Sequence, residues 1–320
     1  MTAPSEPMAL PPVDVVLATY QGAAFLGTQL GSLRRQTHKP RRVLIRDDHS
    51  TDSTPLILRH WAEDWSRIEL LAQKGGSLGV VNSYQALLAH IARDDAHSDG
   101  LLAFCDQDDE WLPEKLERAA RWHQKHGTED SPALYCSRAV LANPMLEPTG
   151  LSPLWKRQPC LRNALVENVA LGCTVVINRA AIDLLDRPWP DAVIAHDWWA
   201  YLVVSAHGGA VHYDPVPSLR YRQHEHNAIG MAGNRLRQAG KRFRRFRKGQ
   251  MPALFTQAEA LETIYGETMS SQSRQELEKF IRLGADDGAG FSAFTSPAFY
   301  RQRWLDDILL RSLIAMGRIS

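Results

Sequence analysis

Four acidic residues lie in the short segment Asp106-Gln107-Asp108-Asp109-Glu110. Carboxylates this close repel one another and raise one another's pKa values unless a cation offsets their charge. Oxygen ligands of this kind suit the hard ions Mg²⁺ and Mn²⁺. The spacing therefore predicts a divalent-metal site that contains Asp106 and Asp108, with Asp108 as the more direct ligand. The alternative is a solvated loop whose acids only form turns and cap a helix.

The residues on either side of this acidic loop favour the metal site. The apolar run Leu101–Phe104 precedes it, as expected of a strand that is buried on both faces of a parallel sheet. Trp111 and Pro113 follow, and the amphipathic stretch 114–123 then predicts a helix. In open α/β sheets, ligands bind outside the carboxyl ends of the strands, and we expect the acidic loop at such an end.

The same alternation of strand and helix organises the first third of the chain. Short β-branched apolar runs predict strands, and apolar residues at helical spacing predict helices. The predicted strands are 13–18, 42–46, 68–72 and 101–105, and the predicted helices are 24–36, 54–65 and 80–92. This order predicts an α/β fold with a doubly wound, mostly parallel sheet that is flanked by helices.

The remaining two thirds of the chain predict further elements and a change of character. We expect strands at 133–142, 171–178, 210–213 and 218–221, helices at 180–185 and 196–207, and a substrate-shaping loop at 143–163. Eight Lys or Arg residues then lie between Arg235 and Lys248 without a single acid. We therefore expect a catalytic domain at 10–230 and a basic, helical C-terminal region at 231–320. In that region, 305–319 is expected to form an apolar helix that packs back on the catalytic domain.

Several motifs, in the correct order over about 13–227, resemble those of the family 2 glycosyltransferases, which have the GT-A nucleotide-sugar-binding fold. They are the first strand with its turn Val13 to Tyr20, the segment Arg46 to Asp52, the glycine-containing segment Gly75 to Asn82, the metal motif Asp106-Gln107-Asp108, and His196-Asp197-Trp198-Trp199. The segment Tyr221-Arg222-Gln223-His224, with Asn227 and Gly230, is similar to a motif of bacterial rhamnosyltransferase-like members.

The chain departs from this family's pattern at two points. The family often has Glu-Asp where this chain has His196-Asp197, and the Gln-x-x-Arg-Trp motif of its processive synthases is not evident. No stretch approaches the ~20 apolar residues of a membrane-spanning helix. We therefore expect transfer of one or a few sugars.

The resemblance implies a site for a nucleotide-diphosphate sugar. Donor contacts are expected from Thr19, Tyr20, Asp47, Asp48, Gly79, Asn82, Asp106, Gln107 and Arg222, and metal contacts from Asp106, Asp108 and His224. Asp47 and Asp48 follow a strand and can accept hydrogen bonds from the base imide or the sugar hydroxyl. Helix capping by Asp48 or Ser50 is a compatible alternative.

The resemblance also implies that Asp197 is the general base, which takes the proton of the acceptor hydroxyl. A single displacement of this kind inverts the anomeric configuration. The alternative is that Asp197 only caps the helix that starts at Trp198. Trp198 and Trp199 either stack on a sugar or belong to the core, and Trp198 is the better candidate for a sugar contact.

Composition places few limits on function. With 320 residues, 44% of them hydrophobic and 23% charged, the chain has the composition of an ordinary globular protein, and 37 Lys and Arg nearly balance 36 Asp and Glu. The four cysteines form no Cys-x-x-Cys pair, so we expect neither a zinc ribbon nor a disulfide framework. The first twelve residues contain no secretion signal, and we expect a cytoplasmic protein.

These features together predict an inverting, metal-dependent glycosyltransferase with Mn²⁺ or Mg²⁺ as its cofactor. The favoured donor is dTDP-rhamnose, with a UDP-sugar as the other possibility, and the expected acceptor is a bacterial surface-glycan or lipid-linked intermediate. The basic segment 235–248 suits peripheral contact with anionic lipids on the inner face of the cytoplasmic membrane, and no nucleic acid is expected. The alternatives are a phosphohydrolase with Asp106 as nucleophile and a non-catalytic nucleotide-sugar-binding protein.

Overall fold

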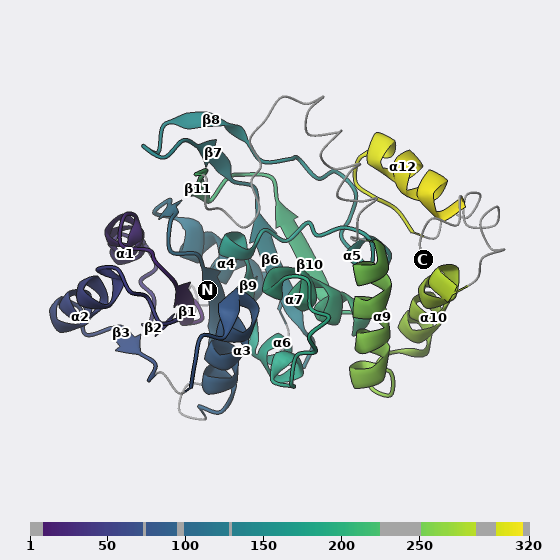
Figure 1. Ribbon diagram of the computed structural model, residues 1–320, viewed down its shortest axis with the longest axis horizontal. Coiled ribbons are helices and arrows are strands. Elements are labelled where there is room, and N and C mark those ends of the chain that lie inside the picture. The colour runs from purple at the N-terminus through teal and green to yellow at the C-terminus, as the bar shows by residue number, and fades with distance from the viewer. Residues whose placement is uncertain are drawn as a thin grey trace, which may run out of the picture.

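The computed structural model describes residues 9–72, 75–94, 99–127, 130–224, 251–285 and 299–315. A seven-stranded sheet lies at its centre (Figure 1). In spatial order the strands are β10 (Ala210–Asp214), β6 (Ala133–Ser137), β9 (Val176–Ile177), β4 (Leu101–Cys105), β1 (Val13–Thr19), β2 (Arg42–Asp47) and β3 (Ile68–Leu70). Only β9 is antiparallel to its neighbours. The predicted doubly wound, mostly parallel sheet is confirmed.

Helices cover both faces of this sheet. Along β1, Val13, Val15 and Leu17 belong to one core and Val16 to the other, because successive side chains of a strand point to opposite faces. The first core packs against α1 (Leu26–Arg34), α2 (Thr54–Asp64) and α4 (Lys115–His126). The second packs against α3 (Gly79–Ala92), α6 (Arg179–Leu185) and α7 (His196–Ala206).

The register of the sheet brings the predicted site segments together. Thr19 at the end of β1 is paired with Asp47 at the end of β2, and Leu17 is paired with Cys105 at the end of β4. The three strands are parallel, so their carboxyl ends meet at one edge of the sheet. The acidic loop therefore lies beside the turns that follow β1 and β2.

A smaller sheet lies next to this edge. It consists of β5 (Glu110–Trp111), β11 (Leu219–Arg222), β7 (Val140–Ala142) and β8 (Pro148–Leu151), in that order. Since β5 follows the acidic loop and β11 pairs with it, the residues just after β11 lie against that loop.

Three elements differ from the expectations. The stretch 133–142 is not one strand: β6 ends at Ser137, and β7 belongs to the smaller sheet, because Arg138 N bonds to Asp214 O and Ala139 N to Ser152 Oγ at the turn between them. The stretch 171–178 contains a 3₁₀ turn, η2 (Gly172–Thr174), and only two strand residues. The loop 143–163 contains β8 and the start of α5 (Leu161–Ala164).

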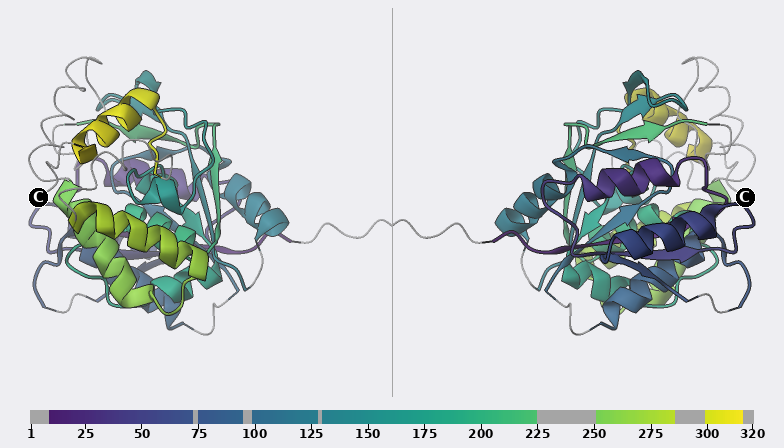
Figure 2. Two further views of the ribbon diagram at one scale, coloured as in Figure 1. Left: turned by 90° about the vertical axis from the view of Figure 1, so that its right-hand side faces the viewer. Right: turned by 90° about the vertical axis from the view of Figure 1, so that its left-hand side faces the viewer.

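The C-terminal helices are α9 (Met251–Tyr265), α10 (Ser271–Ala285) and α12 (Trp304–Ala315). Figure 2 shows α9 and α10 packed side by side, and Leu261 and Tyr265 share the core of α7. In α12, Leu310 is buried, but Leu305 is 62% exposed, so the expectation that this helix packs its apolar residues on the catalytic domain is wrong for Leu305. The basic segment 235–248 and the boundary near Gly230 lie outside the described residues. Of the described helices, none has both the length and the apolar character needed to cross a bilayer.

Candidate functional site

The turn after β1 is held by the side chain of Gln107. Gln107 Oε1 accepts a hydrogen bond from Tyr20 N, and Gln107 Nε2 donates one to Tyr20 O, both at 2.9 Å. A Cβ atom on Gly22 would lie 2.2 Å from Gln107 Oε1, so a larger residue there would displace the Gln107 amide from these hydrogen bonds. Gln107 therefore positions the turn, while the Tyr20 side chain is 57% exposed at the rim of the site.

Asp47 joins the first two strand ends. Its Oδ1 accepts hydrogen bonds from Thr19 Oγ1 at 2.9 Å and from Ser50 Oγ at 2.6 Å, and its Oδ2 accepts one from Ser50 N at 3.0 Å. A cavity of about 530 Å³ opens beside Asp47 between the ends of β2 and β3, lined in part by His49 and Leu71. Asp47 is therefore placed to meet a ligand at this edge.

Asp48 holds the start of α3. It is buried and accepts hydrogen bonds from Ser77 Oγ, from the backbone N–H groups of Leu78 and Gly79, and from Arg46. Although burial opposes ionisation, these four donors hold the pKa of Asp48 well below its usual range. Gly79 has a φ of +74°, a conformation that favours glycine.

The predicted Asn82 lies one turn into the same helix. It is exposed, and its Nδ2 donates to Leu78 O at 3.3 Å. This side chain therefore lies on the surface near the Ser77–Gly79 segment that Asp48 holds.

Asp108 and His224 meet across the acidic loop. His224 Nε2 lies 2.7 Å from Asp108 Oδ2, and the imidazole stacks on Phe25 with the ring centroids 4.9 Å apart. Asp106 lies two residues away, where its Oδ1 accepts a hydrogen bond from Tyr84 at 3.1 Å. Burial, followed by the charge of Asp108, raises the pKa of Asp106 to about 7. A divalent cation would offset this repulsion, and the two carboxylates suit Mn²⁺ or Mg²⁺.

Arg222 supports the acidic loop from the side. It is only 4% exposed. Its Nε donates to Asp108 O at 2.6 Å, its Nη1 donates to Pro144 O, and its backbone N–H donates to Asp109 Oδ1 at 3.0 Å. The guanidinium also lies over the Phe25 ring at 4.5 Å. These contacts assign Arg222 a positioning role, beside the donor contact that the sequence predicts.

Asp109 lies beneath the loop and is fully buried. The possible ligand atoms of Asp106, Asp109 and Cys173 lie within 4.8 Å of one another. Burial raises the pKa of the Cys173 thiol well above its usual value, so the thiol stays protonated and serves as a hydrogen-bond donor to the carboxylates. Lys115, buried over the Trp111 ring at 4.2 Å, adds a cation nearby. Asp109 and Cys173 therefore lie against the acidic loop from its buried side, and metal contacts from Asp106, Asp108 and His224 stay a prediction.

Asp197 lies in the first turn of α7, where Ala195 is the N-cap residue. Its Oδ1 accepts a hydrogen bond from Trp198 N at 2.7 Å, and Asn168 and the backbone of Gly172 also donate to the carboxylate. Burial outweighs these bonds and raises the pKa of Asp197 to about 6. A carboxylate with this pKa is ionised at neutral pH and is a stronger base than an ordinary aspartate.

A ring stack beside Asp197 reaches the acidic loop. His196 is buried and stacks on Tyr84, with centroids 3.7 Å apart, and the Tyr84 hydroxyl donates to Asp106 Oδ1 and Cys105 O. Burial lowers the pKa of His196 to about 3, so the imidazole is neutral. A Cβ atom on Gly172 would lie 3.0 Å from His196 Nε2 and 3.3 Å from Asp197 Oδ2, so a larger residue there would push against both side chains.

The two tryptophans of this motif face the interior. Trp199 is fully buried. Trp198 is partly buried, and its Nε1 donates to Ala164 O at 2.6 Å. These contacts favour the core assignment for both, over the sugar contact considered for Trp198.

Comparison with known proteins places this site in a family. The family model described as "Glycosyl transferase family 2" matches residues 14–154, which contain β1, β2 and the acidic loop. Residues 14–154 of this chain therefore match a family 2 glycosyltransferase domain. The predicted glycosyltransferase activity is thereby confirmed.

Two relatives of this glycosyltransferase cover most of its catalytic part. It is 24% identical over 223 residues to the dTDP-rhamnosyl transferase RfbG of Shigella flexneri. This alignment covers 67% of this chain and 73% of that protein. It is also 24% identical over 193 residues to the UDP-Glc:alpha-D-GlcNAc-diphosphoundecaprenol beta-1,3-glucosyltransferase WfgD of Escherichia coli, with coverage of 60% and 69%.

Solved structures agree on the fold. The S. aureus TarS 1–349 complex with UDP-GlcNAc aligns with a TM-score of 0.54 at 13% identity and covers 96% of this chain and 89% of that one. The mannosyltransferase PcManGT from Pyrobaculum calidifontis, in complex with GDP-Man and Mn²⁺, aligns with a TM-score of 0.51 at 17% identity, with coverage of 96% and 86%. The predicted GT-A fold is confirmed.

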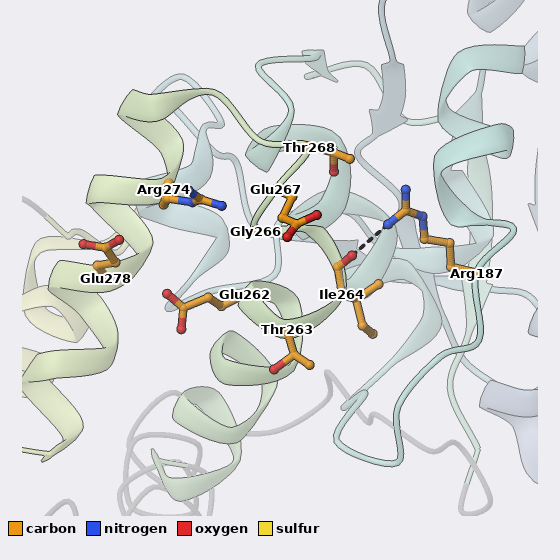
Figure 3. Close-up of a pocket in the computed structure, with 9 residues that line it drawn as sticks. All are labelled: Arg187, Glu262, Thr263, Ile264, Gly266, Glu267, Thr268, Arg274 and Glu278. Atoms are coloured by element: carbon orange, nitrogen blue, oxygen red, sulfur yellow. Dashed lines mark hydrogen bonds between the residues drawn. The ribbon is translucent and has the colours of Figure 1, made fainter.

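A second cavity, of about 470 Å³, lies beside the C-terminal helices α9 and α10 (Figure 3). Arg187 lines one side and donates to Ile264 O at 2.7 Å, and Glu262 and Glu278 lie on the facing helices α9 and α10. None of the predicted site residues lines it. This cavity is therefore separate from the candidate site at the carboxyl edge of the sheet.

The sequence did not predict five residues that contact the predicted site residues and position them. They are Phe25, Tyr84, Asn168, Gly172 and Cys173. Phe25 and Tyr84 have the spacing of ordinary helix and loop residues, so only the fold reveals their contacts. Gly172 was detectable in principle, since an isolated glycine in a strand-like run indicates close backbone approach.

Proposed function

We propose that this glycosyltransferase is an inverting, metal-dependent enzyme that moves a sugar, rhamnose by preference, from a nucleotide-diphosphate donor to a hydroxyl group of a bacterial surface-glycan or lipid-linked acceptor. The observation that carries this proposal is the position of Asp197. It is buried and basic, and its charge contributes to the raised pKa of Asp106 in the acidic loop. A base and a metal-binding loop therefore serve one site.

The donor proposal combines the site with the relatives' names. Thr19, Tyr20 and Asp47 border the edge where the nucleoside would lie, beside the cavity of about 530 Å³. The relative RfbG is named a dTDP-rhamnosyl transferase and WfgD a UDP-glucose-dependent enzyme. Both donors are nucleotide-diphosphate sugars, and we favour dTDP-rhamnose because the Tyr221–His224 segment resembles rhamnosyltransferase-like members.

Asp106, Asp108 and His224 would hold the divalent metal. When bound, Mn²⁺ or Mg²⁺ supplies positive charge that stabilises the departing diphosphate. The chain contributes the positioning: Arg222 fixes the backbone at Asp108, and Phe25 fixes the imidazole of His224. The Tyr84 hydroxyl orients Asp106. These residues keep the ligand atoms in place before the donor arrives, which lowers the cost of binding.

Asp197 would take the proton from the acceptor hydroxyl as that oxygen attacks the anomeric carbon. The new C–O bond forms on the face opposite the diphosphate, the bond to the diphosphate breaks, and the configuration inverts. The hydrogen bonds from Trp198 N and Gly172 keep the carboxylate oriented. The neutral His196 beside it adds no charge that would stabilise or repel the ionised base.

The acceptor proposal rests on the name of one relative and on the basic segment of this chain. WfgD is named for a diphosphoundecaprenol-linked substrate, and the basic segment 235–248 of this chain suits anionic lipid headgroups at about 1 kcal/mol per cation. We propose a lipid-linked acceptor at the membrane surface, with 10–230 as the catalytic domain and 231–320 as the region that contributes membrane contact.

The test is nucleotide release from a panel of dTDP-, UDP- and GDP-sugars, with Mn²⁺, Mg²⁺ or EDTA. We expect one donor to be cleaved in the presence of metal and not with EDTA. Asp108→Ala and Asp197→Asn should each reduce the rate by 100-fold or more, roughly the size of a lost general base. Asp183→Asn on α6, whose side chain is 53% exposed, is the matched control and should keep full activity.

The outcomes separate the parts of the proposal. Cleavage that survives EDTA and Asp108→Ala would remove the metal from it. Cleavage that survives Asp197→Asn would remove the base. A strong preference for UDP-sugars would leave the mechanism in place and correct the donor. Product stereochemistry, read from the anomeric proton by NMR, tests inversion directly.

A further inference from the structure

Helix α12 presents a stripe of apolar side chains to solvent. Trp304, Leu305 and Ile308 are 69%, 62% and 47% exposed, whereas Leu310 is 1% exposed. At about 100° per residue, positions 304, 305 and 308 fall within about 100° of arc on one side of the helix. Leu310 lies on the other side and anchors the helix to the core. The stripe is therefore one continuous outward face.

A second segment runs beside the start of this helix. Arg157 N donates to Gln302 Oε1 at 2.9 Å, and Gln302 Nε2 donates to Arg157 O at 2.8 Å. Leu154, which is 43% exposed, comes just before. This segment follows β8, and Figures 1 and 2 both show β8 and α12 at the same upper side of the molecule.

Exposed cations accompany this apolar stripe, whereas the two acids in the first turn of α12, Asp306 and Asp307, are half-buried. Arg157 and Arg303 are exposed, and Arg157 is held over the Tyr300 ring at 3.5 Å. The nearby acid Asp307 is used internally: its Oδ1 accepts from Arg301 N and its Oδ2 from Arg311 Nε. The outward face therefore combines apolar tips with positive charge. We name it the α12 surface and define it as Leu154, Arg157, Arg303, Trp304, Leu305 and Ile308.

We propose that the α12 surface docks the protein on the anionic face of a lipid bilayer. An indole and aliphatic side chains beside arginines are the composition of helices that lie in a membrane interface, where the apolar tips enter the acyl boundary and the cations meet headgroup phosphates. Anionic headgroups complement a face with two exposed arginines and no exposed acid among its six residues. The segment 235–248, eight cations without an acid, has the same charge preference.

Docking through the α12 surface would bring the enzyme to a lipid-linked acceptor, so its biological role rests on the proposed function. β8 belongs to the smaller sheet, and β11 of that sheet ends at Arg222, which holds the acidic loop. A bilayer against the α12 surface is therefore on the side of the molecule that the smaller sheet occupies. Binding to lipid is nevertheless measured without turnover, so the two proposals fail separately.

The test is co-sedimentation of the full chain with vesicles of phosphatidylglycerol and phosphatidylcholine. We expect binding that weakens in pure phosphatidylcholine vesicles and at high salt. The double variant Trp304→Ser, Leu305→Ser should bind about tenfold more weakly. Leu56→Ser is the matched control: Leu56 on α2 is also 62% exposed, lies at the opposite end of the molecule (Figure 1), and should leave binding unchanged.

A second measurement reports the position of one side chain. Vesicles with brominated acyl chains should quench the fluorescence of Trp304, seen as the difference between the wild type and Trp304→Phe. Vesicle binding by the double variant that equals wild type, or no quenching of Trp304, would overturn the proposal. A change from dimer to monomer in the double variant, with vesicle binding unaltered, would instead make the α12 surface a self-association face and would also overturn it.

Discussion

Asp197, the proposed base, is active when it is ionised, and its burial should make the folded protein less stable in that form. The variant Asp197→Asn tests this. Burial raises the pKa of Asp197 from 3.8 to about 6. Because one pH unit corresponds to about 1.4 kcal/mol, ionising this carboxylate costs roughly 3 kcal/mol more in the folded protein than in the unfolded chain. Asparagine has nearly the same shape and carries no charge, so it removes that cost.

The sign follows from proton binding. Between pH 4 and about 6 the folded protein keeps a proton on Asp197 that the unfolded chain has released, so stability falls as the pH rises and stays level above about 6. Asp197→Asn does not titrate. Relative to wild type, it should therefore gain up to about 3 kcal/mol between pH 4 and pH 8.

The assay is urea unfolding of wild type and Asp197→Asn at pH 4, 5, 6, 7 and 8, at constant ionic strength. Asp183→Asn on the surface of α6 is the control: its half-exposed carboxylate pairs with Arg179, at 2.8 Å, and the loss of such a surface pair should change the stability by less than about 1 kcal/mol. A stability difference between wild type and Asp197→Asn that is the same at pH 4 and pH 8 would refute the reasoning. Whereas stability falls as the pH rises, turnover should increase. With saturating metal at each pH, wild-type turnover should be about tenfold lower at pH 5 than at pH 7.

Three further changes test the support of the site. Gln107→Ala removes both hydrogen bonds to Tyr20 and should destabilise the protein by about 1–3 kcal/mol, measured by thermal unfolding. It should also weaken nucleotide binding, measured by calorimetric titration. An unchanged nucleotide affinity would mean that this turn is not part of the donor site. Gly79→Ala should cost about 1–2 kcal/mol in urea unfolding because of the positive φ, and no loss would mean that the turn relaxes. His196→Glu should move the acidic limb of the pH–rate profile to higher pH, because an added acid beside Asp197 disfavours its ionised form, while His196→Gln should leave the limb in place.

The sheet was predictable from sequence because its signals are local. The runs that form β1, β2 and β4 are apolar on both faces, and α1 and α3 have apolar residues at helical spacing, so hydrophobic pattern alone specifies them. The prediction of a single strand over 133–142 was wrong because both halves of this stretch have the apolar pattern of a strand. Only tertiary hydrogen bonds, such as that of Arg138 N to Asp214 O, send β7 into a different sheet.

The site was predictable in its residue types but not in their roles. Asp47 and Asp48 are neighbours of the same type, and both of their carboxylates accept hydrogen bonds on each oxygen. Only Asp47 lines the cavity, whereas Asp48 accepts from the backbone at the start of α3. The same holds for Arg222, whose guanidinium bonds to two backbone carbonyls. A motif cannot tell a residue that contacts the ligand from one that holds the contacting loop, since both tasks call for a charged side chain at the same strand end.

The chain's departure from the Glu-Asp pattern fits the charge balance of this site. Asp106 already carries a pKa raised by burial and by two neighbouring carboxylates, Asp108 and Asp197. A glutamate in the position of His196 would add a further acid beside Asp197 in this buried region and raise these pKa values further. The neutral imidazole fills that position without charge and stacks on Tyr84. Through Tyr84, whose hydroxyl bonds to Asp106, it also fixes the spacing between the base and the metal loop. His196 therefore ties together, by packing, two acidic groups that repel one another electrostatically.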